Sequence, residues 1–92
     1  MQRQVLSSAG SGATSSIITM HVNDVRLLID GIFDGQTVTL QSQSPEGGWL
    51  DIANGSFSAP DTKILRMNKG AQLRLAVSVG GSPSINAWII DR

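Results

Sequence analysis

The side chains able to carry out acid–base chemistry are few and scattered in this sequence. Its seven acidic residues comprise six aspartates and one glutamate, Glu46, and His21 is the only histidine. Most of the carboxylates lie in or beside turn sequences, where Asp is favoured because it hydrogen-bonds to the nearby backbone. No Ser, His and Asp form an evident set, and a nucleophile needs an activating base close by. The sequence therefore predicts a protein that is not an enzyme and has no small-molecule substrate.

Metal and phosphate binding are also poorly supported. Asp30 and Asp34 frame a short glycine-containing segment, but two carboxylates fall short of the oxygen ligands that Ca²⁺ takes. A lone histidine such as His21 is far more often a surface residue than a ligand, and the absence of cysteine excludes a Cys-based zinc site. Gly47-Gly48 lacks the Lys-Ser/Thr of a phosphate loop and leads into a strand. We expect no cofactor and no metal.

Two tryptophans, Trp49 and Trp88, keep one binding function open. Exposed indoles on a β-sandwich can stack on sugar rings, which would suit a carbohydrate- or host-surface-binding module. The chain has two Trp, two Phe and no Tyr, and this low aromatic content weakens that alternative. The favoured interpretation is that both indoles pack at sheet edges with their N–H groups hydrogen-bonded.

Composition limits the remaining classes of function. Ninety-two residues allow one small domain, and seven basic and seven acidic residues give a net charge of zero. This balance argues against nucleic acid and against an anionic membrane surface, both of which require clustered Lys and Arg. No apolar run approaches the roughly 20 residues of a membrane span, and no signal peptide is evident. A small all-β chain without disulfides often gains stability by associating.

The stretch from Gly31 to Ile52 predicts a β-hairpin, with a turn sequence at each end of its first strand. Within Thr37–Gln41, polar and apolar residues alternate, so the apolar ones share one face of a strand. Asp34-Gly35 before this strand is a tight-turn signal, and Ser44–Gly48 closes its other end with Pro and Gly. A return strand carrying Trp49 follows.

Five further segments have the strand pattern of aliphatic and β-branched residues bounded by turn sequences. They are residues 17–22, 25–30, 63–67, 71–79 and 84–91. In residues 84–91 both alternate rows are largely apolar, which predicts a strand covered on both sides. Residues 53–62, with an Asn-Gly pair, predict an irregular loop.

These elements predict an all-β fold of about seven short antiparallel strands in a sandwich or a jelly-roll-like barrel. Two packed sheets would bury the apolar row of each strand between them. The residues expected in this core are Val38, Leu40, Leu73, Leu75, Val77, Ile85, Ala87 and Ile89.

Residues 1–16 predict a flexible arm in front of a single β-sandwich domain of residues 17–92. The tract of residues 7–16, SSAGSGATSS, has no large side chain and cannot bury enough surface to offset its ordering entropy. The arm is either a disordered terminus or a segment that orders on a neighbouring subunit, with Val5 and Leu6 as its anchor. Its deletion is expected to leave the domain folded but to weaken association.

One family resemblance narrows the function. Residues 31–41, GIFDGQTVTLQ, followed by Ser44–Trp49, SPEGGW, resemble a recurrent pattern in small β-sandwich virion proteins of tailed bacteriophages. Residues 72–77 and 86–88 also suit that pattern, and Glu46 replaces its more usual Asp. The resemblance implies a virion structural protein on the outer surface of the capsid. Its most plausible role is a head decoration (cement) protein that binds the major capsid protein. A tail or fibre accessory role stays open.

A decoration protein acts by binding other subunits, so the sequence should indicate its oligomeric state and its contact residues. A trimer would match the threefold symmetry of an icosahedral shell, and synthesis in the host cytoplasm is expected. Phe57 stands alone in the predicted loop, where it either plugs the edge of the core or contacts a partner. The candidate contact residues are Val5, Leu6, Phe33, Trp49 and Phe57.

Overall fold

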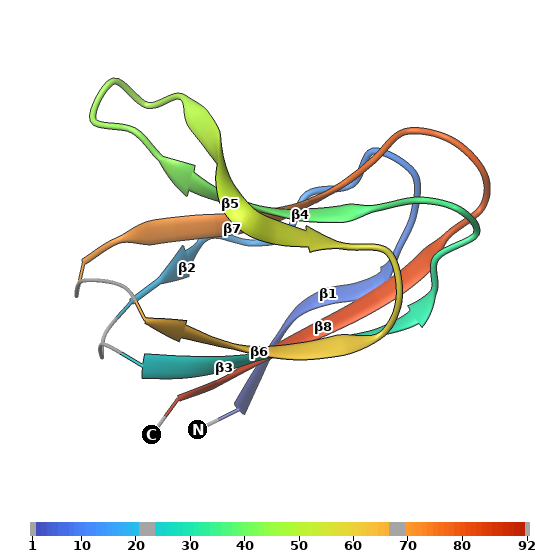
Figure 1. Cartoon of the computed structure of the whole chain (residues 1–92), viewed down its shortest axis with the longest axis horizontal. Coiled ribbons are helices and arrows are strands. Elements are labelled where there is room, and N and C mark those ends of the chain that lie inside the picture. Colours follow the sequence, from blue (N-terminus) through green and yellow to red (C-terminus); the bar gives the residue numbers. More distant parts are fainter. Residues whose placement is uncertain (1, 21–23, 67–69, 92) are drawn as a thin grey trace.

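Alternation of apolar and polar residues favours β-strands in most of the described segments. The computed structural model describes residues 2–20, 24–66 and 70–91, and all regular elements within these ranges are strands. Figure 1 shows their arrangement. The strands are β1 (Gln2–Ala9), β2 (Ile18–Thr19), β3 (Asp24–Ile32), β4 (Val38–Gln43), β5 (Trp49–Phe57), β6 (Asp61–Arg66), β7 (Gln72–Val77) and β8 (Ser84–Asp91).

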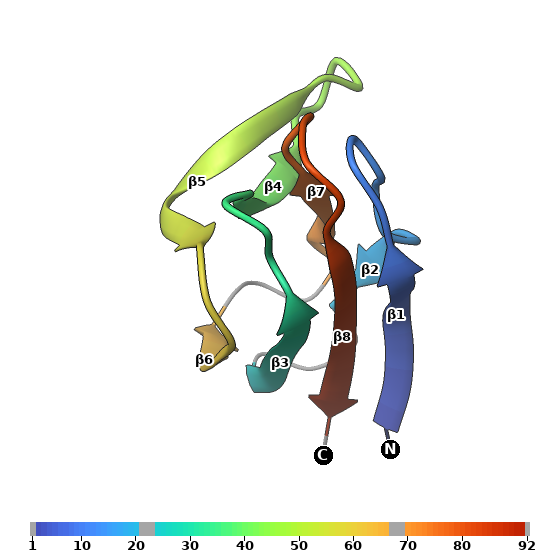
Figure 2. The ribbon, with the colours of Figure 1, turned by 90° about the vertical axis from the view of Figure 1, so that its right-hand side faces the viewer.

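The strands form two four-stranded antiparallel sheets stacked on each other (Figure 2). The first sheet has the order β1-β8-β3-β6, and the second has the order β2-β7-β4-β5. Only β4 and β5 follow one another within one sheet, whereas every other connection crosses between the sheets. This is the arrangement of an eight-stranded jelly roll. The predicted all-β sandwich is therefore confirmed, with eight strands instead of seven.

The core lies between the two sheets and consists of the inward rows of the strands. All eight core residues expected from the sequence are exposed by 5% or less. Ile18, Met20, Val25, Leu27 and Ile29 join them, as the alternation in their strands predicts. Among the described residues the core contains no buried polar or charged side chain, so apolar side chains fill the space between the sheets.

The N-terminal segment is a strand of the first sheet, and its prediction as a flexible arm is wrong. β1 pairs with β8 along its length, and Val5, Leu6 and Ala9 belong to the core. The segment of residues 10–16 is also attached to the sandwich, because the amide of Ser15 donates to the carbonyl of Leu75 in β7 at 2.8 Å. β1 is therefore part of the domain. The apolar pair that seemed to need a neighbouring subunit is buried by this chain itself.

The predicted loop at residues 53–62 is mostly strand, because its Asn-Gly pair forms a bulge instead of a turn. Asn54 has a left-handed φ of 59°, and the pairing of β4 with β5 shifts there from Thr39–Ser56 to Gln41–Asp51. A bulge of this kind bends a strand without ending it. β5 consequently continues to Phe57, whose side chain is only 7% exposed.

Both turns of the predicted hairpin segment are present. Asp34 and Gly35 have φ values of 48° and 78°, and the amide of Gln36 donates to the carbonyl of Phe33 at 2.8 Å. Two successive positive φ values are those of a type I′ turn. The turn at Ser44–Gly48 forms the tip of the β4–β5 hairpin, which projects at the upper left of Figure 1. These two turn sequences thus separate strands where expected.

Candidate interaction surface

Four of the five predicted partner contacts lie in the core of this chain. Val5, Leu6, Phe33 and Phe57 are each exposed by 7% or less. Side chains buried to this degree are not available to a partner without unfolding, so their prediction as interface residues is wrong. Trp49 is half-buried and lies on the outer face of the second sheet.

Trp49 is part of a polar cluster on the second sheet. The guanidinium carbon of Arg74 lies 4.6 Å from the centroid of the Trp49 ring, within the range of a cation–π contact. The Nε of Arg74 donates to Oε1 of Gln41 at 2.8 Å, and Nε2 of Gln41 donates to Oδ1 of Asp51 at 2.9 Å. These side chains hold one another in place on the surface.

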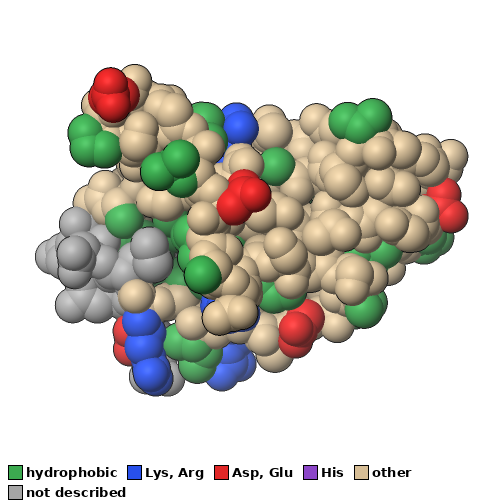
Figure 3. All heavy atoms as spheres, turned by 45° about the horizontal axis from the view of Figure 1, so that its top comes forward, with side chains coloured by type: hydrophobic (Ala, Val, Ile, Leu, Met, Phe, Trp, Pro, Cys, Tyr) green, Lys and Arg blue, Asp and Glu red, His purple; other side chains and the backbone are tan. Residues whose placement is uncertain are grey.

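The rest of this outer face is polar as well. Residues that alternate with the buried rows of β4 and β7 point outward, and they are mainly Thr, Gln and Arg. In Figure 3 the side of the second sheet is turned toward the viewer, and hydrophobic and charged side chains are scattered over a mostly uncharged polar surface. The described residues of this face form no continuous apolar patch in this view.

The outer face of the first sheet is different, because apolar side chains from three strands meet there. Arg26 of β3 lies directly opposite Ile64 of β6 and Ile90 of β8. The next outward residue of β3, Leu28, lies directly opposite Trp88 of β8. Ile64 is 50% exposed and the other three apolar side chains are half-buried. We call this patch of Leu28, Ile64, Trp88 and Ile90 the apolar face.

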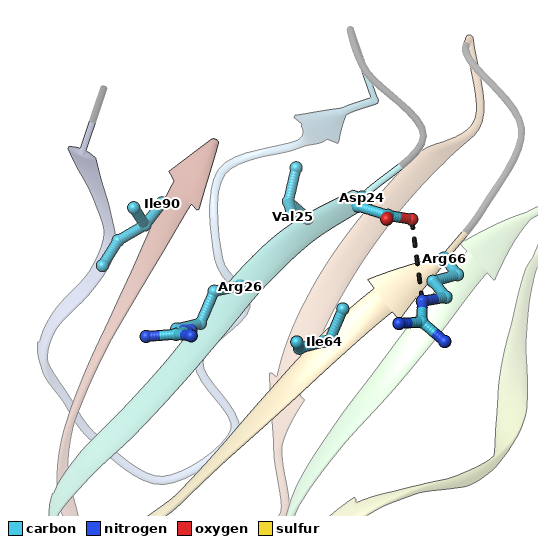
Figure 4. A pocket seen from close by; sticks show the side chains of 6 residues that line it. All are labelled: Asp24, Val25, Arg26, Ile64, Arg66 and Ile90. Carbon is cyan, nitrogen blue, oxygen red and sulfur yellow. Dashed lines mark ion pairs between the residues drawn. The ribbon is translucent and has the colours of Figure 1, made fainter. Parts of the chain in front are cut away.

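A shallow hollow lies at one end of the apolar face, and Figure 4 shows Arg26 between Ile64 and Ile90 there. Its volume is about 350 Å³. The ion pair between Arg66 and Asp24 at its rim has an N–O distance of 3.8 Å, and both side chains are well exposed. Such a pair contributes little to stability. The residues lining the hollow are Asp24, Val25, Arg26, Ile64, Arg66 and Ile90.

The two tryptophans lie on opposite outer faces of the sandwich. Trp49 belongs to the second sheet and Trp88 to the first, so the two indoles cannot form one stacking platform. Trp88 instead extends the apolar face. The last strand was predicted to be covered on both sides. Only its inner row is buried, since Trp88 and Ile90 on the outer side are half-buried.

The carboxylates considered for calcium are used in turns. Oδ1 of Asp30 accepts the amide of Gly31 at 2.8 Å, and Oδ2 of Asp34 accepts the amide of Ser82 at 2.6 Å. Within the described ranges, no three His, Cys, Asp or Glu residues gather in a group that could hold a metal ion. His21 lies outside the described residues. The part of the chain that the structure describes contains no helix that could cross a bilayer.

Fold and surface together define a jelly-roll domain with an apolar interior and two largely polar outer faces, one of which carries the patch named the apolar face. No protein-family model matches the sequence, and no curated protein is similar to it. The structure is similar to that of the SPBc2 prophage-derived protein YomS, with a TM-score of 0.69 and 11% identity over 99% of this chain and 92% of that chain. It is also similar to the Drosophila melanogaster CENP-C cupin domain, with a TM-score of 0.51 and 10% identity over 98% of this chain and 58% of that chain. At these identities the likeness establishes the fold.

The sequence predicts which residues share one side of each strand, but not that those of the apolar face lie together as a patch. The alternation in residues 25–30 places Arg26, Leu28 and Asp30 on one side of a strand. Nothing in the sequence indicates that this strand lies between β8 and β6. The sheet order is therefore the missing information, since it brings Trp88 and Ile64 to the two sides of β3.

Proposed function

We propose that this chain is a bacteriophage virion structural protein. Its proposed role is that of a capsid decoration or cement protein that binds the major capsid protein on the outer surface of the shell as a symmetric oligomer. The apolar face is the observation that carries the proposal, because exposed apolar patches mark interaction sites and a symmetric oligomer needs such a site between its copies. The motif pattern of residues 31–49 and the likeness of the fold to a prophage-derived protein support it.

The physical requirements of a cement protein agree with this domain. Cementing needs no reaction, and an oligomer that binds several capsid subunits at once holds them by multivalency even if each contact is weak. A trimer is the state that a threefold position of the shell favours. The protein would be made in the host cytoplasm and carried on the virion surface.

Heating capsids with and without the protein tests the proposal. Purified protein is added to heads of the phage or prophage that encodes it, prepared without the protein, and disruption is followed by light scattering. We expect an upward shift of the disruption temperature, because a ligand at 100 times its Kd stabilises each occupied site by about 2.7 kcal/mol.

Two results would contradict this proposal. Absence of binding to the heads would contradict any capsid role, and binding with an unchanged disruption temperature would contradict the cement role. Imaging of labelled particles provides the positional control, because a signal on the tail instead of the head would support the tail or fibre accessory role.

Carbohydrate or host-surface binding is the second candidate, and the polar cluster around Trp49 is what favours it. Arg74, Gln41 and Asp51 surround this indole with the hydrogen-bonding groups that a sugar would use. If it binds glycans, a glycan titration of the parent protein should change its Trp fluorescence, and Trp49→Ala should abolish binding. Trp88→Ala, on the opposite face, is the matched control. A parent fluorescence unchanged across the glycans would remove this candidate.

A further inference from the structure

We propose that the apolar face binds the same face of a second copy of this chain, with the two β3 strands antiparallel. The inference is separate from the proposed function, because a twofold contact gives a dimer and the shell symmetry favours a trimer. It goes further by naming the surface and its occupant. The argument uses the charge pattern along β3, the apolar residues beside it and the size of the face.

The outward row of β3 has a charge pattern centred on Leu28. Arg26 lies two residues before Leu28, and Asp30 lies two residues after it. Since a strand rises about 3.3 Å per residue, the two charges lie at equal distances of roughly 7 Å on either side of Leu28. Next to Leu28 the row is therefore positive on one side and negative on the other, and Asp24 beyond Arg26 pairs with Arg66.

This pattern is self-complementary under a twofold rotation. An axis that lies between two stacked copies and crosses β3 at Leu28 places Arg26 of each copy against Asp30 of the other. A twofold contact uses the same patch on both subunits, so each such pair forms twice. Stacking the two β3 strands in parallel would instead place Arg26 on Arg26 and Asp30 on Asp30. Because like charges in an interface are strongly unfavourable, the charges favour the antiparallel arrangement.

The same axis brings apolar side chains together in the centre of the contact. Leu28 meets its own copy, and Trp88, which lies directly opposite Leu28 on β8, also meets its own copy. The described side chains include no ion-pair partner of Arg26, so its guanidinium can donate to an acidic group of the second copy without breaking a pair among them. Aromatic residues and Arg are the residue types enriched in interface centres.

The size of the outer face of the first sheet predicts a weak dimer. Four strands about 4.8 Å apart, each contributing six or seven residues at about 3.3 Å, offer roughly 400 Å² per copy. The total of about 800 Å² lies below the roughly 1,200 Å² of the smallest stable interfaces, in the range of transient contacts. We therefore expect association at tens to hundreds of micromolar. The contact is twofold and gives a dimer, whereas the shell symmetry favours a trimer, so the native mass separates the two.

Sedimentation of the full chain over about 5 to 500 µM tests the inference, a range chosen to bracket the weak affinity of a small interface. The average mass of the parent should rise from the 9.7 kDa of the monomer toward twice that value. Arg26→Asp places a carboxylate against Asp30 of the second copy and should weaken the dimer at least tenfold. Asp30→Arg should do the same, and the double variant should recover most of the parent affinity because both pairs are restored with reversed sign.

Gln72→Asp is the matched control, because it introduces a charge at an exposed position of the second sheet. It should dimerise like the parent, and circular dichroism melts confirm that every variant is folded. A parent that stays monomeric or forms trimers overturns the inference, and so does a dimer that ignores the Arg26 and Asp30 reversals. Binding to capsids is measured separately. If the protein is a monomer or a trimer and binds heads, the dimer contact is wrong and the proposed function stands. If it is a dimer and binds no heads, the proposed function is wrong and the dimer contact stands.

Discussion

Deletion of residues 1–9 is expected to leave a chain that no longer folds cooperatively at room temperature. The deletion removes β1, whose Val5, Leu6 and Ala9 are part of the core, and leaves one edge of β8 without its partner. Burial of a Val or Leu side chain is worth about 1.5–3 kcal/mol, and the whole stability of a domain is only about 5–15 kcal/mol. Loss of the strand therefore removes a large fraction of the total. The measurement is the urea unfolding curve followed by circular dichroism.

Two point variants in the full chain separate the effect of the core from that of the missing strand. Leu6→Ala removes a side chain that is 4% exposed and should cost about 2–5 kcal/mol. Gln4→Ala changes an exposed residue of the same strand and should alter the stability by no more than about 0.5 kcal/mol. A deletion variant that unfolds at the same urea concentration as the parent would show that β1 is dispensable, as the sequence predicted for a flexible arm.

The contrast between β1 and the central strands shows where sequence patterns suffice. In β4 and β7 the pairing is regular, so alternation alone identifies Val38, Leu40, Leu73 and Leu75 as core residues. In β1 the pairing with β8 shifts between Gln4 and Leu6, which turns two successive residues inward. A bulge hides the period of two on which strand recognition depends.

The loop predicted at residues 53–62 is wrong for a different reason, which lies in its Asn-Gly pair. Asn54-Gly55 has the sequence of a hairpin turn, and the same backbone freedom that suits a turn also suits a bulge. The outcome depends on whether the strand has a partner on both sides of the bulge, and here Ser56 pairs with Thr39 of β4. This pairing is a property of the folded sheet and cannot be seen in a ten-residue window.

The candidate site was predictable only in part for a related reason. The five contact residues predicted from the sequence lie in the expected arm, beside the expected turns or in the expected loop, and four of them fill the core. The apolar face instead consists of residues from three strands far apart in the chain, Leu28, Ile64 and Trp88 among them. Such a patch depends on the order of strands in the sheet, which alternation within one strand does not contain.

Gly31→Ala is expected to destabilise the domain by more than about 3 kcal/mol, through strain and a backbone clash together. Gly31 has a φ of 118°, which side chains rarely adopt. A Cβ at this position would collide with the carbonyl oxygen of Ser84 and would lie 3.2 Å from Cα of Ile85. Since Gly31 pairs with Ile85 across β3 and β8, relief of the clash must separate two central strands. Urea unfolding of the parent and the variant measures the difference.

Gly35→Ala is the matched control, because it shares the positive φ but not the close approach. Gly35 has a φ of 78°, and a Cβ there would meet nothing within 4 Å. Its substitution should therefore cost only the conformational strain of about 1–2 kcal/mol. If both variants lose the same stability, the contact between β3 and β8 is not what requires glycine. A much larger loss for Gly31→Ala would show that close backbone packing at this point sets the register of the first sheet. The same register places Trp88 opposite Leu28, so the proposed dimer contact depends on it as well.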